Sequence, residues 1–497
     1  MSTSVPFSIP PEVAEIAKTL ENKGFEAYLV GGCVRDLVLG KKPKDWDITT
    51  NAKPEEIIAC FKETFYENKY GTVGIVNEGV SDETLKVVEV TPYRSEGLYS
   101  DTRRPDEVTF VQSLEEDLKR RDFTINALAY KVPHSDGDKG QLIDLYKGQE
   151  DIKDRIVRAV GKPEERFAED ALRILRGIRI ATELDFAIEE KTETAIKESA
   201  QNLAKIAKER IRDEFSRTLL AEKPMDGLLL AHKLGVLRFI APEIEEGIDI
   251  HQNQAHKYTV FEHNLRALKH AADKKWDLDT RLASLFHDVA KPATRRWSDE
   301  KKDWTFHGHD VVGARMAKKI LTDLRFPVKT IEKVTKLVRW HLFFSDTEKI
   351  TLSAVRRIIR NVGEENIWDL MNLRACDRIG TGRPKEHPYR FRKYRSMVEE
   401  ALRDPLSVAM LALRGEDVIR ETGIAPGPRV GYILHALLEE VLDDPARNTS
   451  DYLATQAKAL AALSEDELKK RGESGKEKKE RAEEVDIEKI RGKYWVK

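Results

Sequence analysis

The stretch that decides the fold is Ala27-Tyr-Leu-Val-Gly-Gly-Cys-Val-Arg-Asp36, followed by Lys44-Asp-Trp-Asp-Ile48. A short apolar run that ends in two glycines and continues into the helical Leu37-Val-Leu39 is typical of a buried strand that turns into a helix. Two glycines let backbone N–H groups approach an anion, and the helix start adds a favourable partial charge. Arg35 would add a fixed positive charge for phosphate. By itself, such a motif is more often an ordinary turn than a phosphate site.

Two aspartates, Asp45 and Asp47, form the second feature. In a strand their side chains would point to the same face, with Cα atoms roughly 6.6 Å apart. Mg²⁺ is bound through one or two carboxylates together with substrate phosphates, so this pair suits nucleotide chemistry. A lone pair of this kind is more often an exposed strand or turn. Because the pair follows the glycine–arginine motif by about ten residues, the combination favours a nucleotide site.

A third charged motif is Arg120-Arg-Asp-Phe-Thr-Ile-Asn-Ala127. Adjacent arginines are usually solvated, but these precede an apolar segment that we predict to be helical and to pack near the core. An arginine, an aspartate and an asparagine on one stretch can bind a triphosphate and the sugar hydroxyls of the same nucleotide.

The bulk composition is that of a globular protein of several domains. The chain has 497 residues, of which 40% are hydrophobic and 35% charged, and its formal net charge is −2. That charge argues against a protein that coats nucleic acid through bulk positive charge. No run approaches the roughly 18 apolar residues of a membrane span, the N-terminus shows no secretory pattern, and the three cysteines lack pairing spacings. We therefore expect a cytoplasmic protein.

The pattern along the chain predicts an α/β head with a mixed sheet, followed by helical domains. A helix is expected over 11–24, and from about Leu114 onward nearly everything shows helical spacing. Strands are predicted at 27–30, 47–50, 71–76, 85–90 and 108–111. The expected domains are a head over 1–150, a helical neck over 151–245, a metal-binding helical domain over 246–400, and a helical tail over 401–497. The charged residues from Ser464 onward are expected to form a solvated helix or a disordered tail.

The three N-terminal motifs, in this order, resemble those of the class II nucleotidyltransferases, which include CCA-adding enzymes and bacterial poly(A) polymerases. The similarity runs through at least the first 220 residues and includes Tyr70-Gly-Thr-Val-Gly74 and the loop 93–105. The resemblance implies a nucleotidyltransferase head in which Asp45 and Asp47 hold two Mg²⁺ ions. The nucleotide contacts that it implies are Gly32, Arg35 and Arg121 at the triphosphate and Asp122 and Asn126 at the ribose.

An arginine-rich helix is predicted over 169–180. At about 100° per residue, one stripe consists of Ala171, Ile174, Leu175 and Ile178. The opposite face carries Asp170, Arg173 and Arg176, with Arg179 at its edge. By itself this is the pattern of an amphipathic surface helix. In the family that the chain resembles, the equivalent face selects the incoming base, because a carboxylate accepts hydrogen bonds from the amines of C and A and an arginine donates to a ring nitrogen. The resemblance assigns base selection to Asp170 and Arg173, and places Arg176 and Arg179 along the nucleotide site.

Eight of the twelve histidines fall between residues 251 and 341. Together with carboxylates, imidazoles suit Mn²⁺, Ni²⁺ or Fe²⁺ better than Mg²⁺ alone. An isolated histidine would more often be a core or surface residue, but the ordered series resembles the HD phosphohydrolase superfamily. The metal ligands that this resemblance nominates are His263, His287, Asp288, His309, His341 and Asp377. His307 competes with His309, which we prefer because glycine–histidine leading into a helix is the commoner context in that superfamily.

The predicted function is CCA addition to tRNA from CTP and ATP, with a phosphohydrolase activity of the HD domain left open. The segment Leu413–Leu434 resembles the family's tail, which would grip the tRNA elbow. Loop 93–105 looks like the loop that CCA-adding and A-adding enzymes keep, so an A-adding enzyme stays open. Poly(A) synthesis is disfavoured, because the basic-aromatic stretch typical of bacterial poly(A) polymerases is missing after Tyr70. The alternative from another class is an HD phosphohydrolase with a non-catalytic, RNA-binding head.

Overall fold

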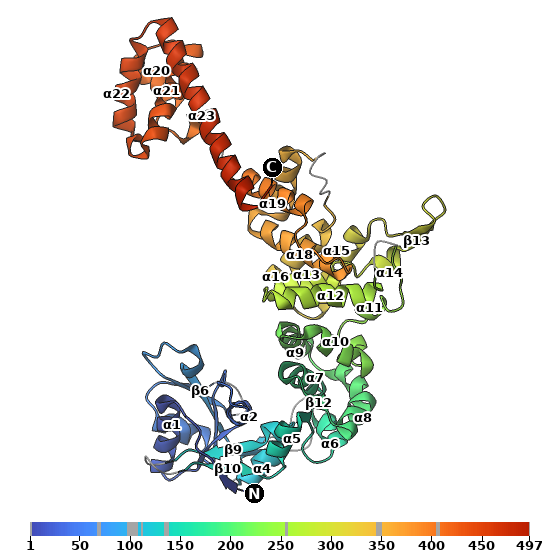
Figure 1. Cartoon of the computed structure of the whole chain (residues 1–497). Helices are drawn as coiled ribbons and strands as arrows, with labels where there is room; N and C mark the ends of the chain where they lie inside the picture. Colours follow the sequence, from blue (N-terminus) through green and yellow to red (C-terminus); the bar gives the residue numbers. More distant parts are fainter. Residues whose placement is uncertain are drawn as a thin grey trace. The chain divides into compact units, whose positions relative to one another are not determined.

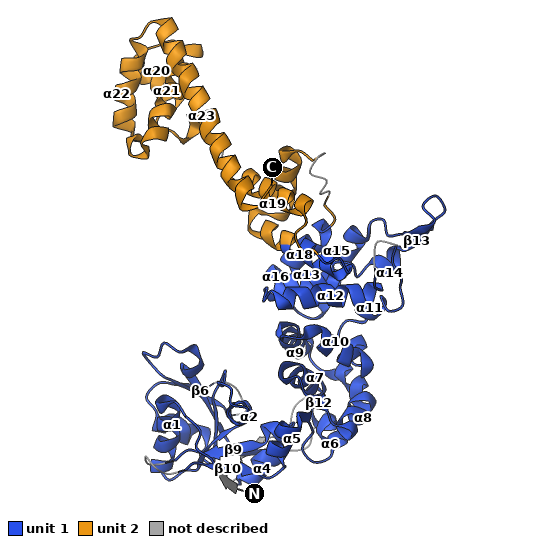
Figure 2. Ribbon diagram, viewed as in Figure 1, with its two compact units in different colours: residues 1–341, 372–384 blue, residues 342–371, 385–497 orange. Residues whose placement is uncertain are grey.

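The computed structural model describes residues 2–66, 71–96, 108–110, 113–133, 139–253, 257–343, 350–403 and 408–496. Tyr70 and most of the predicted loop 93–105 lie outside these residues. The chain divides into two compact units (Figure 2). Unit 1 comprises 1–341 and 372–384, and unit 2 comprises 342–371 and 385–497. None of the described helices has the length and apolar character needed to cross a lipid bilayer.

The head of unit 1 is built on an eight-stranded mixed sheet, drawn in blue and cyan in Figure 1. Its strands, in spatial order, are β1 (Ser2–Ser4), β10 (Gln141–Asp144), β9 (Leu128–Lys131), β2 (Ala27–Val30), β3 (Asp47–Thr50), β6 (Val87–Pro92), β5 (Val73–Val76) and β4 (Thr64–Tyr66). β3 and β6 run parallel, and the other neighbours are antiparallel. Helix α1 (Pro11–Asn22) buries Val13, Ile16 and Leu20 in the same core as Ile48 and Val90, because its apolar residues recur at three- and four-residue spacing.

The prediction of helix from Leu114 onward is wrong for two strands of this sheet, β9 and β10. β9 lies between β10 and β2, and Leu128, Ala129 and Tyr130 are fully buried. A strand covered on both faces reads as a continuous apolar run, which periodicity alone cannot distinguish from a buried helix. The predicted apolar helix after Arg121 is instead the 3₁₀ turn η2 (Thr124–Asn126) followed by β9.

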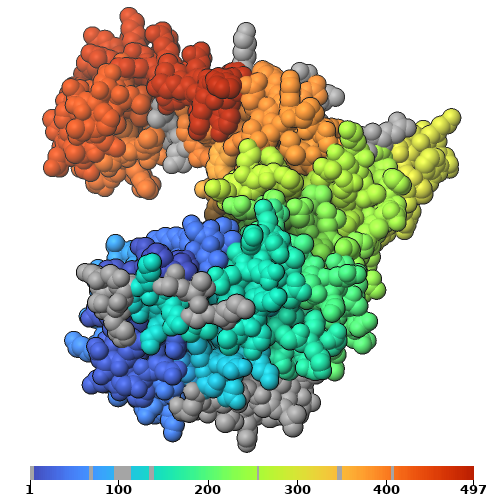
Figure 3. All heavy atoms as spheres, turned by 60° about the horizontal axis from the view of Figure 1, so that its bottom comes forward, coloured from blue at the N-terminus to red at the C-terminus, as the bar shows by residue number. Residues whose placement is uncertain are grey.

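The neck is mostly helical, and its central helix α7 is largely buried. It contains α6 (Pro163–Glu169), α7 (Leu172–Leu184), α8 (Glu190–Ser199), α9 (Lys208–Leu220) and α10 (Pro224–Lys233). α7 packs against both α9 and α10. The stripe predicted on α7 is buried, but so are Arg173 and Arg179, which makes this an internal helix and not a surface one. In the space-filling view, the blue head and the green neck form a continuous surface (Figure 3).

One residue of the predicted arginine helix does not belong to it. Asp170 has φ −141° and ψ 104°, so the backbone leaves the helix between α6 and α7. Its Oδ1 accepts a hydrogen bond from the backbone N–H of Leu172 at 3.0 Å, the local side-chain bond by which aspartate competes with helix formation. Asp170 therefore cannot share a helical face with Arg173 and Arg176. Its position relative to them is set by the non-helical backbone between α6 and α7.

The rest of unit 1 is a helical domain around a histidine cluster. Its principal elements are α12 (Val260–Asp273), α13 (Leu278–Phe286), α15 (His309–Asp323), α16 (Val328–Trp340) and residues 372–380 of α18 (Ile367–Gly380). Between α14 (Lys291–Thr294) and α15 the chain forms a hairpin of β13 (Arg296–Ser298) and β14 (Asp303–Thr305). This hairpin projects from the helices in Figure 1.

Unit 2 is helical throughout its described residues. It contains α17 (Leu352–Val362), α19 (Tyr389–Leu402), α20 (Gly415–Thr422), α21 (Pro428–Asp443), α22 (Ser450–Ala461) and α23 (Glu465–Lys493). The charged C-terminal segment is the helix α23, packed along α21. Gly475 allows this contact, since an added Cβ would lie 2.1 Å from the carbonyl oxygen of His435.

Candidate active sites

The glycine turn between β2 and α2 (Gly32–Val38) lies among four charged side chains. Gly31 has φ +82°, a conformation that only glycine adopts readily. A Cβ added to Gly31 would lie 3.1 Å from Nη1 of Arg121 and 3.7 Å from Oδ2 of Asp47. A Cβ added to Gly32 would lie 3.7 Å from Nη2 of Arg35 and 4.0 Å from Oδ1 of Asp45. The fold therefore brings together residues from the three separate N-terminal motifs.

The strand predicted over 47–50 is β3, and only one of the two carboxylates lies on it. Asp45 is exposed in a bend before β3, and Asp47 is the half-buried first residue of that strand. Asp47 pairs in parallel register with Glu89 of β6, a residue that the sequence analysis missed. Since the neighbours Ile48 and Val90 point into the core, Asp47 and Glu89 share the opposite face. The alternation Val88-Glu-Val90 could have predicted that the Glu89 carboxylate points away from the core. The pairing of β3 with β6 could not be predicted from the sequence, because the two strands are distant along the chain.

This donor set suits hard cations and phosphates. Carboxylate oxygens are the ligands that Mg²⁺ takes in proteins, usually one or two of them with substrate phosphates completing the shell. Asp45 and Asp47 provide such oxygens on an accessible rim, beside the glycine turn and the guanidinium groups of Arg35 and Arg121. Magnesium held by this pair fits the chemistry of the residues present.

Arg121 is held by a buried carboxylate that the sequence analysis also missed. Asp117 is fully buried, with Oδ2 3.1 Å from Nη2 of Arg121 and Oδ1 2.6 Å from Nη2 of Arg120. Burial alone would raise the pKa of Asp117, but the two guanidinium groups outweigh it and lower that pKa below its usual value. Asp117 therefore stays ionised and orients Arg121 toward the glycine turn.

A chain of polar contacts continues from the head into the neck. Arg35 donates from Nη1 to the side-chain oxygen of Asn126 at 2.9 Å, and Asn126 donates from Nδ2 to Asp122 at 3.3 Å. Asp122 accepts from Nε of Arg176 on α7 at 2.7 Å. Burial alone would raise the pKa of Asp122, but Arg176 and Arg173 hold it well below its usual value. Four predicted nucleotide-binding residues are thus connected, with Asp122–Arg176 joining head and neck.

The other predicted residues of the neck are held by further ion pairs. Asp170 lies 2.7 Å from Nη2 of Arg210 on α9. Arg173 is bonded to Glu169 at 2.7 Å and to the backbone carbonyl of Arg120 at 3.0 Å. Arg179 lies farther along α7, with Nε 2.6 Å from Glu214 of α9. The structure therefore places Arg176 beside Asp122 and leaves Arg179 as a residue that links α7 to α9.

The second candidate site is a cluster of six buried residues. They are His263, His287, Asp288, His309, His341 and Asp377. Oδ2 of Asp288 lies 3.0 Å from Nε2 of His263 and 3.3 Å from Nε2 of His287. Its Oδ1 lies 3.1 Å from Nε2 of His309 and 3.5 Å from Nε2 of His341. Asp377 joins the first group, with Oδ1 3.6 Å from His263. Asp288 is therefore shared by two groups of ligands, while His307 lies exposed outside them.

Hydrogen bonds on the far side of three imidazoles fix their tautomers. Nδ1 of His287, His309 and His341 donates to the carbonyl oxygen three residues earlier, at 2.8, 2.5 and 2.7 Å. Their Nε2 lone pairs then face carboxylate oxygens, an arrangement that is repulsive unless a cation lies between. The residues present therefore fit a metal ion with imidazole and carboxylate ligands.

Lys291 supports this cluster and was not nominated from the sequence. It is buried one helical turn after Asp288, with Nζ 2.6 Å from Oδ2 of that residue and 2.6 Å from Oε1 of Gln252. A lysine at this spacing in an apolar segment was a signal that the sequence offered, because a buried ammonium requires a partner.

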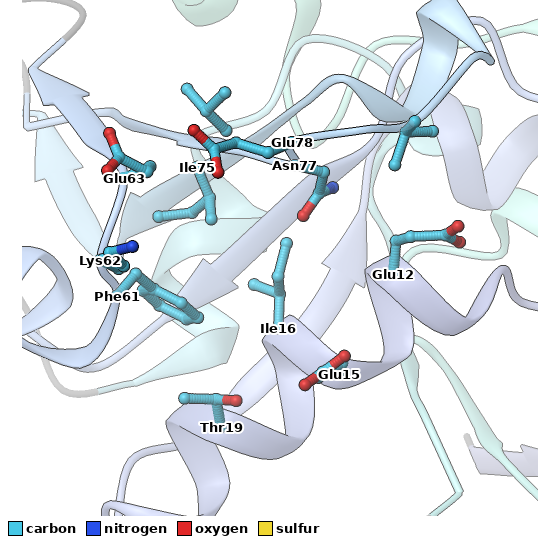
Figure 4. A pocket seen from close by; sticks show the side chains of 12 residues that line it. Glu12, Glu15, Ile16, Thr19, Phe61, Lys62, Glu63, Ile75, Asn77 and Glu78 are labelled. Carbon is cyan, nitrogen blue, oxygen red and sulfur yellow. The ribbon is translucent and has the colours of Figure 1, made fainter.

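A pocket elsewhere on the head does not suit a nucleotide. It lies between α1 and β5, and its lining includes Glu12, Glu15, Glu63 and Glu78 with Lys62 (Figure 4). Four carboxylates against one ammonium would repel a triphosphate. A triphosphate therefore fits the glycine turn, with Arg35 and Arg121, better than this pocket.

Comparison with known proteins identifies the family. Three family models match: the poly A polymerase head domain over residues 27–158, the probable RNA and SrmB-binding site of polymerase A over 185–248, and the HD domain over 260–379. The chain is 34% identical over 450 residues to the CCA-adding enzyme of Lactiplantibacillus plantarum, which covers 90% of this chain and 95% of that protein. The chain belongs to the CCA-adding enzyme family. The CCA-adding enzyme of Ligilactobacillus salivarius is 33% identical over 461 residues, and the alignment covers 91% of this chain and 98% of that enzyme.

A solved CCA-adding enzyme supports the same assignment. The crystal structure of the Bacillus stearothermophilus enzyme in complex with CTP is 29% identical, with a TM-score of 0.59, and covers 91% of this chain and 98% of that one. The family predicted from the motifs is confirmed, as are the fold class and the nucleotidyltransferase class of enzyme with a fused HD domain.

Proposed function

We propose that this protein extends the 3′ end of tRNA with CCA, taking CTP and ATP as substrates. The observation that carries the proposal is the meeting of Asp45, Asp47, Arg35 and Arg121 at the glycine turn, in a chain of the CCA-adding enzyme family. A metal-binding carboxylate pair beside two phosphate-binding arginines is what phosphoryl transfer requires, because the reaction needs positioning and charge neutralisation and no covalent nucleophile.

Each head residue has a proposed role in that transfer. Asp45 and Asp47 would hold two Mg²⁺ ions, and bound Mg²⁺ would supply activation of the RNA 3′-hydroxyl and neutralisation of the triphosphate charge. Arg35 and Arg121 bind the triphosphate, and the Gly32 backbone approaches it without a side chain in the way. The ribose lies against Asp122 and Asn126.

Base selection is assigned to Asp170 with Arg173, and Arg176 lines the site between them and Asp122. The Asp170 carboxylate accepts hydrogen bonds from the exocyclic amines of C and A. Arg210 holds that carboxylate and Glu169 holds the Arg173 guanidinium, so both groups are oriented before a nucleotide arrives. Arg179 acts from farther along α7 through Glu214.

The test is incubation of the purified protein with Mg²⁺ and tRNA that lacks CCA. CTP and ATP are supplied separately and together, and the products are read at single-nucleotide resolution. Two C followed by one A, lost in Asp45→Ala/Asp47→Ala, is the expected result. Addition of A alone to tRNA ending in CC would replace the proposal by an A-adding enzyme, and long A tails on arbitrary RNA by a poly(A) polymerase.

We propose a second activity, hydrolysis of phosphate esters, for the HD domain. The observation that favours it is the complete set of six ligands, divided into two groups by Asp288. His263, His287, Asp288 and Asp377 would hold one transition-metal ion, and Asp288, His309 and His341 a second. Such ions supply a metal-activated water at neutral pH. The test is Mn²⁺- or Ni²⁺-dependent release of phosphate, retained in Asp45→Ala/Asp47→Ala and lost in His287→Ala.

The domain bounds, the tRNA contacts and the cellular location of the protein are also proposals. The division into head 1–150, neck 151–245, HD domain 246–400 and tail 401–497 stays a proposal, with tRNA contacts assigned to the neck and the tail. A cytoplasmic location is proposed from the same pattern of free, scattered cysteines.

A further inference from the structure

A row of paired residues crosses the head sheet from a candidate metal ligand to the outer strand β4. Asp47 of β3 is paired with Glu89 of β6. Glu89 is also paired with Gly74 of β5, and Gly74 with Phe65 of β4, the last strand of the sheet. Residues that are directly paired in a sheet point to the same face. Phe65 therefore lies on the face of the two carboxylates, opposite the face that packs on the core.

Gly74 allows the Phe65 ring to lie over β5. A Cβ added to Gly74 would lie 2.4 Å from Cζ of Phe65 and 2.6 Å from its Cε1, so any other residue would displace the ring. The ring thus lies one strand nearer the carboxylates than its own strand does. Because neighbouring strands are about 4.8 Å apart, two spacings, or about 10 Å, remain between the ring and Asp47. One face of the ring covers Gly74, and since the side chain is still 43% exposed, the other face is open to a ligand.

Two valines extend the ring into an apolar floor. Val76 and Val87 are directly paired, and they stand two residues from Gly74 and Glu89 on their own strands, so both point to the same face as the ring. They are 37% and 38% exposed, whereas the valines and isoleucine of these strands on the core face are at most 3% exposed: Val73, Ile75, Val88 and Val90. Because the floor carries no charge, it fits the neutral face of a nucleobase and not a phosphate.

The floor lies where the in-line geometry of the transfer requires the RNA. In the sheet, β2 lies on one side of β3, and β6, β5 and β4 lie on the other. The triphosphate is proposed at the glycine turn after β2, beside Arg35 and Arg121. Phosphoryl transfer places the attacking and the leaving oxygen in line, on opposite sides of the phosphorus. If pyrophosphate leaves toward the glycine turn, the attacking 3′-hydroxyl approaches from the side of β6 and its neighbours.

We propose that Phe65, Val76 and Val87 bind the base of the RNA nucleotide whose 3′-hydroxyl is extended, with the Phe65 ring stacked on that base. The inference rests on the nucleotide addition proposed above and adds to it a binding site for the RNA end. Stacking suits this end, because the terminal base changes with each addition and every base has a π-face. The site therefore holds successive ends alike, while the choice of the incoming base stays with Asp170 and Arg173.

The test compares the full-length protein with Phe65→Leu, which keeps an apolar side chain, and with Phe65→Tyr, which keeps the ring. Tyr66→Ala is the matched control, because Tyr66 is the next residue of β4, is 51% exposed, and is paired with Val73 on the other face. We expect the KM for tRNA lacking CCA to rise roughly 5- to 150-fold in Phe65→Leu, the factor that one lost base–aromatic stack implies. Phe65→Tyr and Tyr66→Ala should keep the wild-type KM for tRNA, and the KM for CTP should stay unchanged in every variant.

A tRNA whose terminal nucleotide is abasic distinguishes stacking from support of the strand. The wild type should have a raised KM for this RNA, and Phe65→Leu should raise that KM no further, since there is no base left to stack. If Phe65→Leu weakens the use of both RNAs by the same factor, Phe65 only supports β4 and the inference is overturned.

Binding without Mg²⁺ or nucleotide separates failure of this inference from failure of nucleotide addition. The dissociation constants of the two tRNAs, with and without the terminal base, are measured by filter binding. If the wild type adds no nucleotide but prefers the tRNA with the base, and Phe65→Leu loses that preference, nucleotide addition fails and the stacking site stands. Equal dissociation constants of the two tRNAs in the wild type would overturn the stacking site.

Discussion

At the scale of single residues, the backbone conformation of Gly31 controls the geometry of the candidate nucleotide site. Its positive φ and the nearness of Arg121 and Asp47 mean that a side chain is excluded twice, by strain and by crowding. Gly24 offers a matched comparison, because it also has positive φ, +89°, but nothing lies within 4 Å of an added Cβ.

We expect Gly31→Ala to abolish most nucleotide addition, while Gly24→Ala keeps it. Gly24→Ala should lose about 1 kcal/mol of unfolding free energy, from backbone strain alone. Gly31→Ala should lose more, about 2–3 kcal/mol, because its φ of +82° with ψ of −134° is a conformation that essentially only glycine adopts and its Cβ would lie 3.1 Å from Arg121. Steady-state rates with CTP and chemical denaturation measure the two effects. Equal activity of the two variants would show that crowding at Arg121 and Asp47 is unimportant.

Asp117 carries a prediction about pH. Its pKa in the folded protein is lowered below the value of 3.8 in the unfolded chain, because Arg120 and Arg121 outweigh the effect of burial. A depressed aspartate pKa stabilises the fold above the unfolded value, and that stability is lost as pH falls through the folded value. Asp117→Asn should therefore cost about 3 kcal/mol near pH 7, and the difference from wild type should shrink below about pH 4. Denaturation across this range measures it, and a difference independent of pH would contradict it.

At the scale of elements, α9 holds charged side chains of α7 and of the non-helical residue Asp170 that precedes it. Arg210 pairs with Asp170, and Glu214 pairs with Arg179 while its Oε1 lies 3.9 Å from Arg176. Because three charged groups at the candidate nucleotide site are held by two side chains of one helix, a change on α9 should alter base choice without a direct contact to the base.

We expect Arg210→Ala to relax base selection. Without the bond at 2.7 Å, the Asp170 carboxylate is no longer held in one orientation, and the preference of kcat/KM for CTP over UTP should fall about 10- to 100-fold. Arg217→Ala is the control, since Arg217 is exposed on the same helix. A uniform fall in rate for all nucleotides, with selectivity intact, would assign Arg210 a merely structural role.

At the scale of the whole molecule, the chain combines two candidate metal sites on separate sets of elements. The head site depends on β2, β3 and α2, and the HD site on α12, α13, α15, α16 and α18. No ligand is common to the two sets, so their chemistry should be separable.

Asp288→Asn should remove the transition-metal content of the purified protein and its phosphate-ester hydrolysis, because Asp288 belongs to both ligand groups. Nucleotide addition to tRNA should proceed at the wild-type rate. His309→Ala should reduce the metal content only in part, since His309 belongs to one group. Metal analysis and both activities are measured on the same preparation, and loss of nucleotide addition in Asp288→Asn would show that the sites are coupled.

Much about this protein was determined by the sequence alone. Short sequence motifs predicted the family, the mixed sheet of the head and the HD domain. The glycine turn, the carboxylate pair and the histidine series are short runs of residues that the chemistry of each site requires, so they can be recognised in the sequence. The six residues of the histidine cluster were nominated before any geometry was known, since each stands in a short characteristic context. The helical spacing of Ile174, Leu175 and Ile178 likewise predicted one buried side of α7, although the burial of Arg173 and Arg179 was not predicted.

Other features were decided only by the tertiary structure. β9 became a central strand because it is covered on both faces, a condition that its own apolar sequence cannot distinguish from a helix. Asp170 left the predicted helix because its side chain bonds the Leu172 N–H, and Glu89 joined Asp47 only through the pairing of β3 with β6. Arg210 acquired its role only when folding brought it to Asp170. Asp117 with Arg121 and Lys291 with Asp288 are local pairs, but their burial was decided by the tertiary structure. Contacts such as Asp170–Arg210 connect distant segments, and spacing along the chain carries no information about them.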